Sequence, residues 1–377
     1  MAFVLTDEQT MLRDTARQFF AEQAPVENLR ALRDGDDADG FDRDIWARLV
    51  EMGFAGILIA EEHGGTAFGP MGLGIVMQEA GRTLAATPLY ATAVLGASLI
   101  GAAGSEAQKS ELLPKIASGA LLTALALEES GHHAPAQIAM TATADGDGFT
   151  LDGAKTFVAD GHIADMLIVA ARTSGKAGET QGLSLFLVDA KAEGVSITRT
   201  KMADSRNAAD IAFKGVKPDA LLGERDAGFD ALEPALDLGR ICLAAEMLGG
   251  VETVFETTLA YLKERKQFDA VIGSFQALKH RTAEMFCQVE IARSVVLDAL
   301  SALEERRNDV PRAASLAKAR LCDTARLITN EGVQMHGGVG MTDEFDVGLF
   351  LKRARVQAQM LGNADFHRRR YADLGGY

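Results

Sequence analysis

The hydrophobic pattern changes its period twice along this chain of 377 residues, and this limits the folds that the chain can adopt. Up to about residue 122, and again after about residue 226, apolar side chains recur at helical spacing. Between these points the chain consists of short β-rich runs separated by turn residues, such as "DMLIVAAR" and "LSLFLVDA". A chain of this length exceeds one compact core. We therefore predict a multidomain α+β protein with domains at 1–122, 123–225 and 226–377.

The first domain is predicted to be α-helical. In "FDRDIWARLVEMGF" the residues Phe41, Ile45 and Leu49 follow one helical face. Thr6 followed by Gln9 has the spacing of a capping box, which predicts a helix that begins directly after Thr6. The runs of the middle domain predict an antiparallel β-sandwich or a small barrel.

Long helical segments are predicted for the last domain, at 228–264, 274–306, 311–333 and 343–373. The stretch "LGNADFHRRR" at 361–370 contains a Gly-Asn pair that should interrupt the last of them. We interpret its three arginines as a helix end, because cations there oppose the negative pole of the helix dipole.

Charge and composition exclude several partners. The formal net charge of −15 argues against nucleic acid or an anionic membrane as the main partner, because both would repel such a surface.

Residues 83–105 carry no charge and could suggest a membrane span. Pro88 divides this segment and small residues dilute it, so we predict a buried helix instead.

The cysteines and the amino terminus point to the cytoplasm. Cys242, Cys287 and Cys322 are far apart, and each lies in a predicted helix, so we expect reduced core residues and no disulfide framework. The first twenty residues carry charges every few positions and lack the apolar run of a signal peptide. We therefore expect a cytoplasmic protein.

Two segments of the last domain could bind an anion. Arg265 follows a predicted helix and Gln276 opens the next, so a guanidinium and free backbone donors would lie close together. In "QMHGGVGMTDEFD" the glycines 337, 338 and 340 would let backbone amides approach phosphates. The alternatives are a solvated helix end in the first segment and a helix C-cap in the second.

The two segments together, in this order, make the chain resemble the acyl-CoA dehydrogenase family. "RKQFDAVIGSFQ" and "EGVQMHGGVGMTDEF" carry the resemblance, with "EEHGG", "KTFVADG", "GLSLFLVD" and "FKGVKPDALLG" in the order typical of that family. The resemblance implies an N-terminal helical domain, a middle β domain and a C-terminal four-helix bundle. It also implies bound FAD, α,β-desaturation of an acyl-CoA thioester, electron transfer flavoprotein as the electron acceptor, and a dimer or a dimer of dimers.

The resemblance also assigns site residues. Arg240 would contact the substrate, and no metal site is implied. Ala159 stands where the family usually has a hydroxyl that bonds the flavin edge. The implied FAD contacts are Arg265, Phe268 and Gln276 at the pyrophosphate and adenosine end, Gln334, Gly337 and Gly338 from a neighbouring subunit, and Phe157 and Val158 against the flavin.

The loop "LALEESGHHAPA" at 125–136 resembles the flavin and substrate loop of the family only in part. Glu128 matches, as does Gly131 or His132, but His133 and Ala134 replace a small hydroxyl residue and an aspartate. The two histidines could be a metal-binding or acid–base pair, or simply polar loop residues.

The family's reaction needs a carboxylate that removes the α-proton, and the usual positions lack one. The first position is Gly362, and the second is Gly239, directly before Arg240. The catalytic residue is therefore unknown from the sequence. The carboxylates that could replace it are Glu128, Glu129, Asp237, Glu246 and Asp365.

Three hypotheses follow from the missing base. In the first, the chain is an acyl-CoA dehydrogenase with a relocated base. In the second, it is the partner subunit of a heterotetramer and completes FAD sites for a sister chain that carries the glutamate. In the third, the fold serves other flavin chemistry that needs no base.

Overall fold

The computed structural model describes residues 4–146 and 148–377, and these form two compact units. Unit 1 contains residues up to 31, residues 74–85 and residues 240–377, whereas unit 2 contains residues 32–73 and 86–239. Along the chain, helices come first, a sheet follows and long helices end it. The predicted α+β order is therefore confirmed.

Unit 1 is helical apart from one short hairpin. α1 begins at the predicted capping box, because Gln9 N donates to Thr6 Oγ1 (3.2 Å) and Thr6 N donates to Gln9 Oε1 (3.0 Å). The elements that lie wholly or partly in unit 1 are α1 (Asp7–Gln23), α2 (Val26–Asp34), α4 (Pro70–Arg82), α7 (Gly228–Glu264), β9 (Lys266–Gln267), β10 (Ala270–Val271), η4 (Ile272–Ser274), α8 (Gln276–Glu304), α9 (Val310–His336), η5 (Gly337–Met341), α10 (Val347–Gln357) and α11 (Ala364–Leu374).

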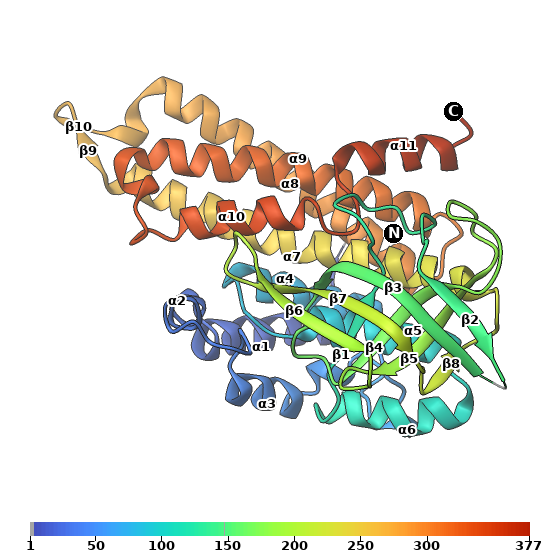
Figure 1. Ribbon diagram of the computed structural model, residues 1–377. Coiled ribbons are helices and arrows are strands. Elements are labelled where there is room, and N and C mark those ends of the chain that lie inside the picture. Colours follow the sequence, from blue (N-terminus) through green and yellow to red (C-terminus); the bar gives the residue numbers. More distant parts are fainter. Residues whose placement is uncertain (1–3, 147) are drawn as a thin grey trace. The chain divides into compact units, whose positions relative to one another are not determined.

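α9 is the helix on which α8, α10 and α11 pack (Figure 1). Its buried face is rich in alanine, including Ala314, Ala317 and Ala325, which lets neighbouring helices approach closely. Glycine has the same effect where α4 meets α7: a Cβ on Gly81 would lie 2.0 Å from the carbonyl oxygen of Glu246. Small residues therefore set the distances between these helices.

The last predicted segment, 343–373, is interrupted where the Gly-Asn pair predicted a break. α10 ends at Gln357 and α11 starts at Ala364. Leu361 and Gly362 between them have positive φ angles of 50° and 102°, and Asn363 caps α11 by accepting from Phe366 N (3.0 Å). The interpretation of the arginines as a helix end was wrong, because residues 368–370 lie inside α11 and its last turn has no basic residue.

Unit 2 is built on one eight-stranded sheet of order β6-β7-β3-β2-β4-β5-β8, with β1 also paired to β4. Most pairs are antiparallel as predicted, but β1 runs parallel to β4. The strands are β1 (Thr123–Ala126), β2 (Thr141–Asp145), β3 (Gly148–Ala159), β4 (Met166–Arg172), β5 (Leu183–Asp189), β6 (Val195–Lys201), β7 (Asn207–Val216) and β8 (Ala220–Leu222).

The helices that lie wholly in unit 2 are short. They are α3 (Arg43–Glu51), η1 (Phe54–Gly56), η2 (Glu61–His63), the π-helix η3 (Tyr90–Gly96), α5 (Ala97–Ala103) and α6 (Glu106–Ala117). η3 is buried throughout, and α5 buries Ala97, Leu99 and Ile100, which confirms the prediction of a buried helix in the uncharged segment. Among the described residues, no helix combines the length and the apolar character needed to cross a membrane.

The cysteines only partly follow their prediction. All three are free and helical, and Cys242 and Cys322 are buried. Burial raises the pKa of the Cys242 thiol, which makes it unreactive. Cys287 is exposed on α8 and is no core residue, contrary to the prediction.

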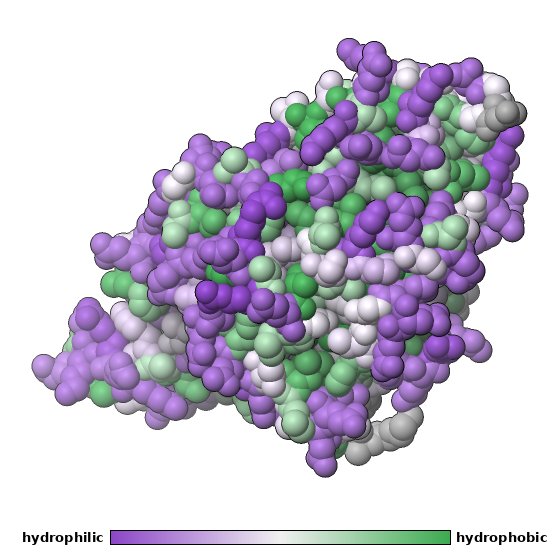
Figure 2. Space-filling view, turned by 90° about the horizontal axis from the view of Figure 1, so that it is seen from below, coloured by the Kyte–Doolittle hydropathy of each residue, from purple (hydrophilic) through white to green (hydrophobic). Residues whose placement is uncertain are grey.

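The face shown in Figure 2 mixes hydrophilic residues with small groups of apolar ones.

Candidate active site

The space beside Gly362 is filled by two aromatic rings. A Cβ at this position would lie 2.5 Å from Phe366 Cδ1 and 2.9 Å from His367 Nε2, closer than Cβ contacts occur in proteins. The φ angle of 102° also favours glycine over any residue with a side chain. The predicted base position is therefore occupied by the first turn of α11, and no side chain fits there without movement of these rings.

A buried lysine fixes the same loop. The fully buried Lys318 Nζ donates to the carbonyl oxygens of Gln357 and Gly362, both at 2.9 Å. Burial lowers the pKa of Lys318, since the charged ammonium loses its hydration, and the positive charge of Arg240 lowers it further. Lys318 thus satisfies the carbonyl of Gln357, the last residue of α10, which the helix leaves without a donor, and that of Gly362 in the loop that follows.

His367 is the titratable group nearest to Gly362, where the base was expected. One of its two ring nitrogens cannot act as a base. Its Nε2 lies 2.9 Å from the carbonyl oxygen of Leu361. A carbonyl only accepts, so Nε2 must carry the proton. The other nitrogen, Nδ1, lies 3.5 Å from Ser315 Oγ, and the whole residue is buried. We therefore interpret His367 as a structural residue of the α9–α11 contact.

The second predicted base position, Gly239, is buried on α7, and its carbonyl oxygen accepts from Tyr90 Oη at 3.2 Å. Arg240 follows it and is fully buried, with its guanidinium carbon 5.8 Å from the centre of the Phe366 ring. Asp237 is also buried and lies three residues before Arg240, on the same face of the helix. Arg240 therefore lies in the same packed region as the α11 rings.

Three of the candidate carboxylates already have cationic partners. Glu129 Oε1 lies 2.8 Å from the buried Lys155 Nζ, and Glu129 also accepts from two backbone amides. Glu246 pairs with Arg353 (2.7 Å), and the highly exposed Asp365 pairs with Arg368 (2.9 Å). Each of these carboxylates is therefore already engaged in an ion pair of the fold.

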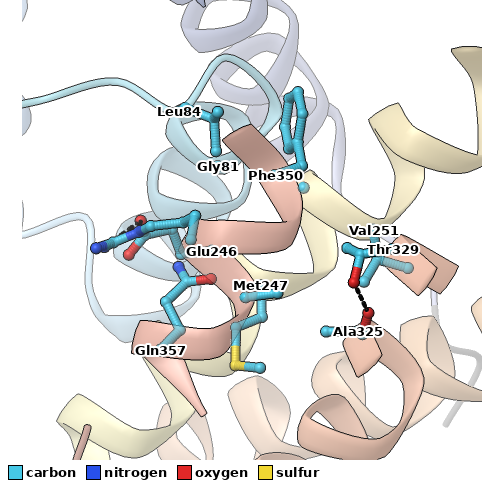
Figure 3. A pocket seen from close by; sticks show the side chains of 12 residues that line it. Gly81, Leu84, Glu246, Met247, Val251, Ala325, Thr329, Phe350 and Gln357 are labelled. Carbon is cyan, nitrogen blue, oxygen red and sulfur yellow. Dashed lines mark hydrogen bonds and ion pairs between the residues drawn. The ribbon is translucent and has the colours of Figure 1, made fainter. Parts of the chain in front are cut away.

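A small cavity in unit 1 is lined by Glu246, Arg353 and Gln357 among apolar neighbours such as Met247 and Phe350 (Figure 3). Its volume is about 10 Å³. A space of this size holds about one water molecule. It is too small for an acyl chain, so we interpret it as the site of a buried polar contact between α7 and α10.

Glu128 and His133 form a partly buried pair in the β1–β2 loop. Glu128 Oε1 lies 2.5 Å from His133 Nδ1, and only 2% of the His133 side chain is exposed. His132, in contrast, is exposed. The metal-binding alternative is not supported, because no group of three or more His, Cys, Asp or Glu residues in the described parts of the chain could hold a metal ion. The carboxylate–imidazole pair remains as the acid–base alternative.

The first predicted anion-binding segment lies at the exposed ends of α7 and α8. Arg265 is exposed directly after α7, and Phe268 is 90% exposed at the tip of the β9–β10 hairpin, which projects beyond these helices (Figure 1). Gln276 is the first residue of α8, and the N-cap residue before it, Phe275, makes no side-chain capping hydrogen bond. Its first amides are therefore available to an anionic ligand.

The second segment lies next to the first. The ring of Tyr261, in the last turn of α7, lies 4.4 Å from the ring of His336, the last residue of α9. Gln334, Gly337 and Gly338 are exposed there, and a Cβ on either glycine would meet nothing within 4 Å. The open space and the donors fit the phosphates and ring edges of a dinucleotide.

The residues predicted to contact the flavin lie on β3 in unit 2. Phe157 is half-buried with a positive φ of 53°, and its amide donates to Asp210 Oδ1 (3.3 Å). Val158 is buried in the unit, so its side chain is not presented to a ligand, and Ala159 ends the strand. Sequence reasoning missed four buried polar residues. The local pattern around Lys155, His367 and Arg172 does not mark them as buried, and Lys318 has one signal, its place on the apolar face of α9.

Comparisons with known proteins place these features in a family. Three family models cover the chain: the N-terminal domain of acyl-CoA dehydrogenase at residues 6–120, its middle domain at 124–216 and its C-terminal domain at 226–374. Probable acyl-CoA dehydrogenase YngJ of Bacillus subtilis is 32% identical, over 98% of this chain and 98% of that protein. The caffeyl-CoA reductase-Etf complex subunit CarC of Acetobacterium woodii is 31% identical over 93% of each.

Solved structures of acyl-CoA dehydrogenases are similar to this chain over its whole length. Butyryl-CoA dehydrogenase from Megasphaera elsdenii covers all of both chains with a TM-score of 0.92 and 27% identity. The ChsE4-ChsE5 complex from Mycobacterium tuberculosis has a TM-score of 0.90 and 26% identity, over 100% of this chain and 99% of that one. The chain thus belongs to the acyl-CoA dehydrogenase family, whose members are oxidoreductases acting on the CH–CH bond of acyl-CoA thioesters.

Proposed function

We propose that this chain binds FAD and takes part in the α,β-desaturation of an acyl-CoA, with electrons passed to electron transfer flavoprotein. The observation that carries the proposal is the exposed group of donors at one end of unit 1, where Tyr261 and His336 bring the two predicted segments together. Two relatives support the electron acceptor and the reaction: CarC is a subunit of an Etf complex, and the Megasphaera protein is a butyryl-CoA dehydrogenase.

The predicted cofactor residues have distinct roles in this proposal. Arg265 and the uncapped start of α8 would bind the pyrophosphate through charge-assisted hydrogen bonds, and Phe268 would cover an apolar surface of the cofactor. Gln276 would add hydrogen bonds, and Gln334, Gly337 and Gly338 would reach the same cofactor from a neighbouring subunit, where the two glycines leave space for close approach. Phe157, rather than the buried Val158, would contact the flavin. When bound, FAD would accept the hydride that leaves the β-carbon of the acyl group.

The remaining predictions stay proposals. We propose domains at 1–122, 123–225 and 226–377, substrate contact by Arg240, an oligomer that completes each FAD site, and a cytoplasmic location that fits the free cysteines. The chain would belong to a subgroup that lacks the glutamate base, since Gly362 and Gly239 occupy both usual positions.

A second candidate function is that of a partner subunit in a heterotetramer with a glutamate-bearing sister chain. Packing at Gly362 favours it, because Phe366 and His367 fill the space that a base would need. The ChsE4-ChsE5 structure, a complex of two different chains, supports it by analogy.

One experiment separates the two functions. The chain is purified alone, tested for bound flavin, and mixed without oxygen with a panel of acyl-CoAs. Bleaching of the flavin supports the self-sufficient enzyme and contradicts the partner subunit. Bleaching only after co-expression with a glutamate-bearing sister chain supports the partner subunit. Absence of flavin in both preparations would contradict the proposed cofactor.

A further inference from the structure

Arg172 ends β4 in unit 2 and is 7% exposed, yet within the described part of the chain its hydrogen-bond partners are all backbone carbonyls. Nε donates to Ile138 O (3.0 Å), Nη1 to Ser174 O (3.3 Å) and Gln181 O (2.9 Å), and Nη2 to Ala136 O (3.2 Å) and Glu179 O (2.8 Å). A guanidinium has five N–H donors, so every one of them is used.

These carbonyls belong to two loops. Ala136 and Ile138 lie in the β1–β2 loop (127–140), whereas Ser174, Glu179 and Gln181 lie in the β4–β5 loop (173–182). The fixed fork of the guanidinium therefore connects the loops in one geometry. A buried cation without a carboxylate partner is costly, so this arrangement indicates that the geometry itself is needed.

Further contacts stabilise the same arrangement. Gly178 N donates to Ala136 O (2.9 Å), which connects the two loops directly. Gly178 has a φ of 97°, and a Cβ there would lie 2.8 Å from Gln137 Nε2. The β1–β2 loop is also held at its start, because Thr156 N donates to the carbonyl oxygen of Glu128 (2.8 Å).

The side chains that this loop presents are Glu128 and His133. Their partly buried contact joins two residues of one loop that are five positions apart, so it depends on the conformation of the loop. Arg172 holds the segment directly after His133, at Ala136 and Ile138. Loss of the guanidinium would therefore free the loop on the histidine side of the pair.

We propose that Arg172 is a positioning residue of the active site: through its five carbonyl contacts it holds the β1–β2 loop against the β4–β5 loop and thereby places the Glu128–His133 pair. That this loop faces cofactor or substrate rests on the proposed function. The contact between the loops and its effect on His133 do not depend on it.

The test replaces Arg172 by lysine. Arg172→Lys keeps the charge, but an ammonium has three donors and cannot serve five carbonyls. The matched control is Arg199→Lys: Arg199 also connects a loop of unit 2 to the sheet, by donating to Asp37 O and Asn207 Oδ1, but it does not touch the two loops. Amide hydrogen exchange of segments 128–138 and 174–181 is measured by mass spectrometry in the full chain.

We expect exchange in both segments to become at least about tenfold faster in Arg172→Lys and to stay unchanged in Arg199→Lys, because only the first variant breaks the contact between the loops. Gly178→Ala, which crowds Gln137 without changing Arg172, should speed exchange in the same two segments. It keeps the test decisive if Arg172→Lys fails to fold. Unchanged exchange in a folded Arg172→Lys, or in Gly178→Ala if that variant alone folds, overturns the proposal.

A second readout separates positioning from general support. In protein labelled with ¹⁵N-histidine, His133→Gln identifies the His133 ring signal among seven histidines. That signal should shift in Arg172→Lys and not in Arg199→Lys. In flavin-loaded protein or its complex, the KM for acyl-CoA should rise severalfold in Arg172→Lys only. Loop opening and a His133 shift without any change in KM would leave the structural contact standing and contradict the role of the loop in the proposed function.

Discussion

The ammonium nitrogen of Lys318 lies 2.9 Å from the carbonyl oxygen of Gly362, so a buried cation holds the loop where the family's base was expected. Phe366 and His367 fill the space where a side chain at Gly362 would lie. The missing carboxylate is therefore part of a packed arrangement and not merely a substitution at one position. The absence of a carboxylate at position 362 can therefore be tested by measuring stability as well as activity.

Introducing a glutamate at the family's base position by Gly362→Glu should not create a working base. The new side chain meets Phe366 and His367 and forces a φ of 102° on a residue with a Cβ, so we expect a loss of about 2–4 kcal/mol in the free energy of unfolding. Urea denaturation measures this loss, and anaerobic flavin bleaching measures activity.

The control for that variant is Gly101→Glu. Gly101 lies on α5 without a positive φ, and a Cβ there would meet nothing within 4 Å, so the same substitution should change stability by less than about 1 kcal/mol. A Gly362→Glu protein that bleaches with acyl-CoA and keeps its stability would show that the loop can accept a base.

Removal of the buried ammonium by Lys318→Met should loosen the loop between α10 and α11. Gln357 and Gly362 would each lose the donor to a carbonyl, and we expect a net destabilisation of about 1–3 kcal/mol by urea denaturation. Lys352→Met, on the exposed face of α10, is the control and should have little effect. Equal or greater stability of Lys318→Met would mean that desolvation of the ammonium outweighs its hydrogen bonds.

The sequence predicted those elements whose local pattern agrees with their tertiary environment. The bounds of α7 and the capping box at Thr6 follow from periodicity and hydrogen-bonding residues close in sequence. The arginines of α11 were misread because long-range contacts determine their position: Arg368 pairs with Asp323 on α9, and Arg370 donates to Pro311 O and Ser315 Oγ.

In the candidate site, too, local patterns could be predicted from the sequence and long-range packing could not. The segments around Arg265 and Gly337 were recognisable because each carries its donors within a few residues. The filling of the space beside Gly362 depends on a backbone angle that composition does not determine. Lys318 offered one signal, since it lies between Ala314 and Leu321 on the apolar face of α9, but a lysine at such a position usually extends to solvent.

Lys155 should give the chain a pH-dependent stability in the alkaline range. Burial lowers the pKa of Lys155 from 10.5 to about 8, against the opposing effect of Glu129. The unfolded chain therefore binds the proton more tightly, and this group's contribution to stability is smallest below pH 8 and rises between about pH 8 and 10.5. Relative to Lys155→Met, the wild-type free energy of unfolding should gain up to about 3 kcal/mol over this window.

Denaturation at several pH values between 7.5 and 10.5 measures that difference. Lys201→Met is the control, because Lys201 is 60% exposed and its loss should leave the slope unchanged. Parallel pH profiles of wild type and Lys155→Met would contradict the lowered pKa.

Replacement of the exposed guanidinium by Arg265→Ala should weaken FAD binding by about 10- to 100-fold, because the pyrophosphate would lose a charge-assisted hydrogen bond worth about 1.5–3 kcal/mol. The dissociation constant is measured by flavin fluorescence on the deflavinated protein in its native oligomer. Lys263→Ala is the matched control: it removes one positive charge from the last turn of the same helix and is also exposed. If binding depends only on the overall charge of this end, both variants weaken it equally. A selective loss in Arg265→Ala identifies a directed contact, whereas unchanged FAD affinity in that variant removes Arg265 from the cofactor site.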